Sequence, residues 1–189
     1  MQLNYFNRPY FENGAIEKIS RVLRTHKIEN PLICTDPGLA SIGMTEKIKS
    51  LLSDGFSSAY YEETPGNPTE KAVNKALELY KLNNCDGVIG FGGGSSMDLA
   101  KAVALMANHD GNIIDYSVVE GGYKKITETI PMIAIPTTSG TGSEVSDGAL
   151  IIMDDGRKLI FASPHLRPNA AICDPELTIG LPPILTAGS

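Results

Sequence analysis

Two glycine-rich segments carry residue types that could bind a phosphate. The first runs from Gly90 to Asp98 and contains four glycines and two serines, and the second, residues 136–145, interleaves glycines with threonines and serines. Glycine permits close approach to backbone N–H groups because it has no Cβ, and N–H groups at a helix N-terminus attract anions. Two such segments in one chain predict a site that holds one extended phosphate-containing ligand from two sides.

Short apolar runs precede both segments and predict the strands that position them. Residues 86–90 lead into the first segment, and residues 132–135 lead into the second. The apolar pattern over residues 95–108 then predicts a helix, so the first segment joins a strand to a helix N-terminus. A tight strand-to-helix turn that needs small residues only for packing is the alternative, but the four glycines and two serines exceed that need.

Two aspartates lie where they could either contact a ligand or stabilise a helix. Asp36 ends the apolar run 31–35, and an aspartate there can accept hydrogen bonds from ribose hydroxyls and repel a 2′-phosphate, which favours NAD over NADP. Asp36 could equally cap the helix that begins at Pro37. Asp98 lies in the first turn of the helix over 95–108, where its charge suits the helix dipole or meets a ligand.

The second segment offers hydroxyl groups and is followed by a lysine. The hydroxyl-bearing residues are Thr137, Thr138, Ser139, Thr141 and Ser143. They could hydrogen-bond a phosphate or a ribose, or they could form nested turns. Lys158 lies on a strand predicted over residues 158–161, from which it could reach the same cleft or extend into solvent.

Strand-like and helix-like segments alternate along the chain. Helices are predicted over residues 15–26, 41–52, 69–83 and 95–108, and strands over 31–35, 57–61, 86–90, 132–135, 148–153, 158–161 and 170–174. Asn67 is the expected N-cap of the third helix, because Pro68 follows at the first helical position. Residues 154–157 predict a hairpin turn. The alternation indicates right-handed β–α–β units around a parallel sheet.

Composition and charge exclude several classes of function. The 189 residues carry a formal net charge of −6 and no basic cluster, so nucleic-acid binding is not expected. No apolar run is long enough to span a bilayer and the N-terminus does not resemble a signal peptide, so we expect a cytoplasmic protein without membrane contact. The three cysteines and three histidines are far apart in sequence, which predicts reduced thiols and no metal site among these residues.

Four stretches, in the same order and at similar spacing, resemble the iron-containing (group III) alcohol dehydrogenase family. They are residues 64–69, 92–101, 135–145 and 174–178, and the likeness covers essentially the whole chain. Within the family, residues 119–122 and 151–159 are most similar to the 4-hydroxybutyrate dehydrogenase branch. The resemblance implies an α/β fold: a parallel-sheet, Rossmann-like dinucleotide-binding domain with a β-hairpin addition over residues 1–180. Residues 181–189 would begin a C-terminal helical domain.

The resemblance also implies NAD as the cofactor and assigns residues to it. Asp36 would bind the adenosine ribose, and the pyrophosphate would lie against Asn67, Gly93, Gly94, Ser95 and Ser96. The cofactor would further be lined by Thr137, Thr138, Thr141 and Lys158, with Leu177 near the adenine and with Ser143 and Val145 near the nicotinamide. Asp98 stays a candidate contact of the same ligand.

The family's activity implies hydride transfer between NAD and a short-chain alcohol or aldehyde such as 4-hydroxybutyrate or succinate semialdehyde. A divalent iron or zinc ion, held by one aspartate and three histidines, would act as the Lewis acid. Those ligands would follow residues 181–187, so we expect them beyond Ser189 and expect the 189-residue chain to be inactive by itself. We also expect a homo-oligomer.

Three alternatives stay open at the level of sequence. The chain could be a non-catalytic dinucleotide-binding module, a relative of glycerol or polyol dehydrogenases, or a lyase similar to dehydroquinate synthase. The run of threonines, serines and glycines over residues 137–144 argues against the lyase.

Overall fold

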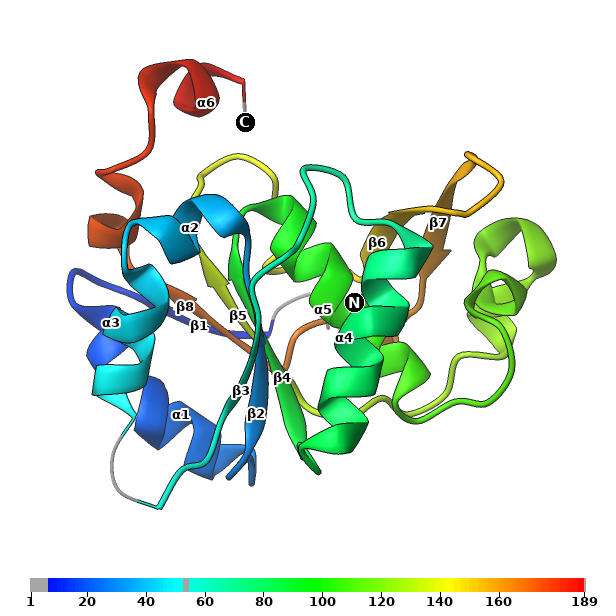
Figure 1. The fold of residues 1–189 in the computed structure, drawn as a ribbon, viewed down its shortest axis with the longest axis horizontal. Coiled ribbons are helices and arrows are strands. Elements are labelled where there is room, and N and C mark those ends of the chain that lie inside the picture. The colour runs from blue at the N-terminus through cyan, green and yellow to red at the C-terminus, as the bar shows by residue number, and fades with distance from the viewer. Residues whose placement is uncertain (1–6, 53–54, 189) are drawn as a thin grey trace, which may run out of the picture.

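The structure, a computed structural model, describes residues 7–52 and 55–188. A parallel sheet lies between two groups of helices (Figure 1). Its strands follow the order β1-β8-β5-β4-β2-β3, and every neighbouring pair is parallel. The strands are β1 (Arg8–Phe11), β2 (Pro31–Cys34), β3 (Ala59–Tyr61), β4 (Gly87–Gly92), β5 (Met132–Pro136) and β8 (Ala170–Cys173). The predicted α/β, Rossmann-like architecture is confirmed.

Each face of the sheet has its own apolar cluster. One face packs against η1 (Ala15–Lys18), α1 (Ile19–Thr25), α2 (Pro37–Ser41) and α3 (Met44–Leu51), and the other packs against α4 (Glu70–Leu82) and α5 (Gly94–Met106). The central strands are buried on both faces, which explains why their sequences are continuous apolar runs.

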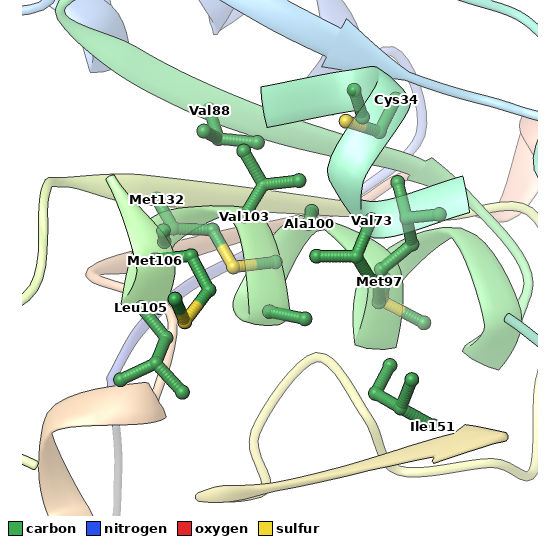
Figure 2. Close-up of a cluster of buried hydrophobic side chains, with 14 of the residues drawn as sticks. Cys34, Val73, Val88, Met97, Ala100, Val103, Leu105, Met106, Met132 and Ile151 are labelled. Atoms are coloured by element: carbon green, nitrogen blue, oxygen red, sulfur yellow. The ribbon is translucent and has the colours of Figure 1, made fainter. Parts of the chain in front are cut away.

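Helix α5 is the most deeply buried helix and lies directly on β4. Figure 2 shows its side chains in the cluster that joins Val88 of β4 to Ile151 of β6. Gly90 makes this close contact possible, because a Cβ at Gly90 would lie 2.9 Å from the Met97 Cα. The position of the α5 N-terminus is therefore fixed by packing along the whole helix.

A two-stranded antiparallel hairpin packs against α5 on the side away from the sheet. It consists of β6 (Gly148–Ile152) and β7 (Lys158–Ala162), which confirms the predicted β-hairpin addition. The remaining elements are short: η2 (Ile113–Tyr116), η3 (Val118–Glu120), η4 (Gly122–Lys124), η5 (Pro164–Leu166), η6 (Pro175–Thr178) and α6 (Pro183–Ala187). In the described residues 7–52 and 55–188, no helix has the length and apolarity to cross a membrane.

Two local predictions were wrong. The helix expected over residues 41–52 begins only at Met44 as α3, because Ser41 ends the preceding helix α2 and Gly43 adopts a left-handed conformation with φ of +77°. The N-cap of α4 is Thr69 and not Asn67, and the Thr69 hydroxyl accepts from the Ala72 N–H at 3.2 Å. The chain stays extended up to Thr69 because the Pro68 carbonyl accepts from the Ile152 N–H of the hairpin.

Candidate functional site

The candidate site lies at the carboxyl edge of the sheet, between the two neighbouring strands from which the sheet is extended in opposite directions. Strand β2 is followed along the chain by β3 on one side, whereas β4, its other neighbour, is followed by β5 on the opposite side. In open α/β sheets, ligands bind in the crevice beyond the carboxyl ends of strands at such a switch point. Asp36 follows β2 and Gly93 follows β4, so both predicted residues flank this crevice.

A large cavity fills the crevice. Its volume is about 740 Å³, within the usual range for small-molecule sites of roughly 300–1,000 Å³. Its walls come from the segments that follow β2, β3, β4, β5 and β8. The predicted residues that line it are Asp36, Gly93, Ser95, Ser96, Thr137, Thr138 and Leu177. Segments far apart in the sequence therefore meet around one space.

A second, smaller cavity adjoins the first at the α5 N-terminus. Its volume is about 370 Å³, and it is lined by the predicted residues Gly94, Asp98, Thr141 and Ser143 together with Leu150 and Ile160 of the hairpin. Gly93 lines the large cavity and Gly94 lines the small one, so the first turn of α5 separates the two.

Three predicted residues line neither of these two cavities. Asn67 and Lys158 are exposed and bind each other, since the Lys158 Nζ donates to the Asn67 Oδ1 at 2.8 Å. Asn67 directly follows Gly66, which lines the large cavity, so the lysine charge lies near its rim. Val145 is half-buried in the second glycine segment.

The two glycine segments touch each other at the N-terminus of α5. A Cβ at Gly93 would lie 3.4 Å from the Thr138 Cγ2, and a Cβ at Gly94 would lie 3.3 Å from Thr141. The N-cap residue is Gly93, which has no side chain to act as a cap, and no side chain among the described residues takes its place. These N–H groups, which a capping side chain usually satisfies, are therefore left for an anion.

Two buried hydroxyl groups in the large cavity have no partner. The Oγ1 atoms of Thr64 and Thr138 are inaccessible to solvent and hydrogen-bond to no atom of the described residues. A buried hydroxyl without a partner costs about 1–3 kcal/mol. Unpaired hydroxyls and uncapped N–H groups around one cavity form a donor set that fits the phosphates and ribose of a dinucleotide.

Asp36 caps a helix and also faces the cavity. Its Oδ1 accepts from the N–H groups of Gly38 at 2.9 Å and Leu39 at 3.1 Å, so the capping alternative is confirmed. Its Oδ2 points towards Gly92, where a Cβ would lie 3.3 Å away. The cap thus occupies one carboxylate oxygen, and the contact with a ribose stays a prediction.

Asp98 and the neighbouring Lys101 hold the second glycine segment from within the protein. Asp98 accepts from the Ser143 hydroxyl at 2.7 Å and from the Leu150 N–H at 3.0 Å. Lys101 is fully buried, although the sequence analysis assigned it no role. Its position within the otherwise apolar face formed by Met97, Ala100 and Ala104 is the sequence signal that could have revealed it.

A metal ion does not fit the described part of the chain. Residues 7–52 and 55–188 contain no group of three or more His, Cys, Asp or Glu side chains that could hold one. We therefore derive no chemical step through a metal ion from these residues.

Comparison with known proteins identifies the family to which this chain belongs. Residues 7–175 match the family described as "Iron-containing alcohol dehydrogenase". The chain belongs to this family. The family predicted from the motifs of the sequence is therefore confirmed.

Two curated relatives and one solved structure illustrate the likeness. The chain is 46% identical over 186 residues to 4-hydroxybutyrate dehydrogenase of Cupriavidus necator, an alignment that covers 98% of this chain and 48% of that protein. It is 38% identical over 181 residues to alcohol dehydrogenase 4 of Schizosaccharomyces pombe, covering 95% and 42%. The structure of sulfoacetaldehyde reductase from Bifidobacterium kashiwanohense in complex with NAD+ superposes with a TM-score of 0.88 at 31% identity, covering 99% and 50%. The chain thus spans about half the length of the proteins it matches.

Proposed function

We propose that this chain is the NAD-binding part of an NAD-dependent, metal-dependent alcohol dehydrogenase. One observation carries the proposal: the uncapped α5 N-terminus, both glycine segments and two unpaired hydroxyls surround a single cavity at the switch point of the sheet. The likeness to a reductase whose solved structure contains NAD+ supports the same cofactor.

The α5 N-terminus holds the pyrophosphate in this proposal. The N–H groups of Gly94, Ser95 and Ser96 lie in the first helical turn, where the helix dipole favours negative charge. Thr64 and Thr138 line the cavity wall, and rotation of each side chain brings its unpaired hydroxyl to a phosphate or ribose oxygen. The positive charge of Lys158, beside Asn67 at the rim, adds long-range attraction for the dinucleotide.

The adenosine end of NAD lies in the large cavity, between Asp36 and Leu177. The Oδ2 of Asp36 accepts from the ribose hydroxyls, and its negative charge disfavours the 2′-phosphate of NADP. Leu177 is buried in the cavity wall and provides an apolar contact for the adenine.

The nicotinamide end lies towards the smaller cavity. Leu150 and Ile160 give this cavity an apolar wall, and Thr141 and Ser143 give it hydroxyl groups. Such a mixed lining suits an aromatic ring that carries one amide group. NAD, when bound, supplies the hydride acceptor of the reaction.

The proposed substrate class is a short-chain alcohol or its aldehyde, with 4-hydroxybutyrate as the first compound to test. This choice rests on the 46% identity to a 4-hydroxybutyrate dehydrogenase. A dinucleotide-binding protein without catalysis is the second candidate, because the described residues include no group that could hold a metal ion.

Two assays test the proposal. Fluorescence titration with NADH should show saturable binding. The signal is easy to read because NADH changes its emission when it binds and the chain contains no tryptophan that would add its own. NAD reduction should then be measured with 4-hydroxybutyrate, glycerol and ethanol, with and without iron or zinc. Binding together with turnover supports the dehydrogenase, and binding without turnover supports the second candidate for the 189 residues. Absence of saturable NADH binding would refute both.

A further inference from the structure

Lys101 is a buried lysine in the second turn of α5. Its side chain has no exposed surface, although an ammonium group loses much of its hydration energy on burial. Buried lysines are therefore rare unless their charge and all their donors are satisfied. The cofactor roles proposed above do not use this residue, so its burial needs an explanation.

The ammonium group of Lys101 donates to three oxygen atoms beyond α5. Its Nζ lies 2.9 Å from the Ser143 Oγ, 2.9 Å from the Ser146 Oγ and 2.7 Å from the Gly148 carbonyl oxygen. An ammonium group has three donors, so each of them has a partner. Ser143 belongs to the second glycine segment, Ser146 directly follows that segment, and Gly148 is the first residue of β6.

Asp98, one turn earlier on α5, completes the network. Its Oδ1 accepts from the Ser143 hydroxyl and lies 3.9 Å from the Lys101 Nζ. Its Oδ2 accepts from the Leu150 N–H. The Ser143 hydroxyl therefore accepts from the lysine and donates to the aspartate, which fixes its orientation.

The second glycine segment has few other attachments to the rest of the protein. Its backbone is joined to β4 through the Thr137 N–H and the Gly92 carbonyl, and it receives one further hydrogen bond from the Asn7 side chain at the Glu144 carbonyl. The bonds at Val145 and Ser146 are internal, since both N–H groups donate to the Gly142 carbonyl. The side chains of α5 thus connect residues 141–147 to the core, together with Asp147, whose carbonyl accepts from the Ser163 N–H and whose carboxylate accepts from Arg167.

We propose that Lys101 is a positioning residue for cofactor binding: it holds residues 141–147 against α5 so that Thr141 and Ser143 face the α5 N-terminus. The inference rests on the proposed function, because it assigns the network a role in binding the dinucleotide. It differs from a purely structural role, since the same helix offers its N-terminus to the phosphate and its second turn, with Asp98 and Lys101, to the loop.

The charge of Lys101 contributes to the same effect. Burial lowers the pKa of Lys101 to about 8, although the negative charges of Asp98 on its own helix and of Glu144 and Asp147 on the loop oppose this shift. Above pH 8 the neutral amine keeps only two donors and can otherwise only accept from a serine hydroxyl, so the bonds to the loop lose the strength that the positive charge gives them. The attraction between this charge and Asp98, Glu144 and Asp147 is lost at the same time, and both changes loosen the loop and so weaken binding.

The test compares NADH affinity in the 189-residue chain and two variants. Lys101→Met keeps the length of the side chain but removes its donors, and we expect about ten-fold weaker NADH binding at pH 7. Lys75→Met makes the same chemical change on the exposed face of α4 and should leave the affinity unchanged. If Lys101→Met does not fold, Ser146→Ala removes one acceptor of the lysine, and we expect about three-fold weaker binding.

Two further measurements separate positioning from general stability. Between pH 7 and pH 9 the NADH affinity of the wild-type chain should fall, whereas that of Lys101→Met should stay constant. Hydrogen exchange should accelerate at residues 141–147 of Lys101→Met and stay unchanged in β2 and β4.

Each outcome bears on the proposal separately from the proposed function. Equal NADH affinity and an equal pH profile in wild type and Lys101→Met would overturn the positioning role. If the wild-type chain binds no NADH, the proposed function fails, and the exchange experiment decides the role of Lys101 alone: unchanged exchange at residues 141–147 refutes it, and faster exchange there supports it.

Discussion

Asp36 shows how one side chain serves both the fold and the candidate site. Its Oδ1 caps α2 through two N–H groups, and its Oδ2 faces the large cavity next to Gly92. A cap that uses one oxygen of a carboxylate fixes the orientation of the other oxygen. The proposed ribose acceptor is therefore held in place by α2 before any ligand binds.

Replacement of Asp36 should change cofactor preference. Asp36→Ser keeps an N-cap side chain but removes the negative charge, so the fold is retained and the repulsion of a 2′-phosphate disappears. We expect the ratio of NADH affinity to NADPH affinity, measured by titration of each cofactor, to fall by about ten-fold. The same ratio in wild type and variant would contradict the assignment of Asp36 to the ribose.

The buried cysteines should react slowly with alkylating reagents, which gives a test of their predicted state as reduced thiols. Burial raises the pKa of the Cys85 thiol to about 11, and it also raises the pKa of Cys34, which has no exposed surface. A raised pKa keeps a thiol protonated and non-nucleophilic at pH 8. Alkylation with iodoacetamide, followed by mass spectrometry, should be slow at both residues in the native chain and fast in urea. Fast native modification of Cys34 would show that its burial is incomplete.

At the scale of the residue, sequence alone predicted the positions near the site better than their roles. Asp36, the first glycine segment and Thr138 were found because they follow strands, and strand ends meet at one edge of a parallel sheet. The sequence did not predict that Asp98 holds the second glycine segment and the hairpin through hydrogen bonds, since its partners Ser143 and Leu150 are about fifty residues away. Lys101 was missed because most helical lysines are solvated.

Helix α5 links recognition to packing at the scale of the element. Its N-terminus carries uncapped N–H groups at the cavities, and its later turns lie between the sheet and the hairpin. The apolar pattern predicted this helix well, because a helix that is buried against the sheet must have apolar residues at most of its positions. The starts of the neighbouring helices were predicted less well: the Pro68 carbonyl pairs with Ile152, which is a tertiary contact invisible in the local pattern.

The backbone of the first glycine segment gives an element-scale prediction. Gly92 has φ of +143°, and a Cβ there would lie 2.6 Å from the Ser96 Oγ. Gly92→Ala should lower the free energy of unfolding by about 2 kcal/mol, because an alanine is strained in that conformation. Urea unfolding of this variant and of Gly66→Ala provides the measurement.

Gly66 is the matched control for that experiment. It lines the large cavity next to which Gly92 lies, but a Cβ at Gly66 would meet no atom within 4 Å. The free energy of unfolding of Gly66→Ala should therefore stay within about 0.5 kcal/mol of wild type. Equal stability of the two variants would contradict the structural role given to Gly92.

At the scale of the molecule, alternating strands and helices predicted a parallel sheet but not its strand order. The order places β4 between β2 and β5, and this arrangement brings Asp36, Gly93 and Thr137 around one cavity. Strand order depends on which helical faces pack together, and a single sequence does not contain that information in a local pattern. The division of the site into two adjoining cavities followed only from the packed hairpin.

Calorimetric titration of the 189-residue chain with NADH, and separately with NADPH, is the most direct test of the central claim. A cavity built from an uncapped helix N-terminus, unpaired hydroxyls and Asp36 should bind NADH with a one-to-one stoichiometry and at least ten-fold more tightly than NADPH. Absence of binding to either cofactor would contradict the claim that these residues form a dinucleotide site, and equal binding of both would contradict the role of Asp36.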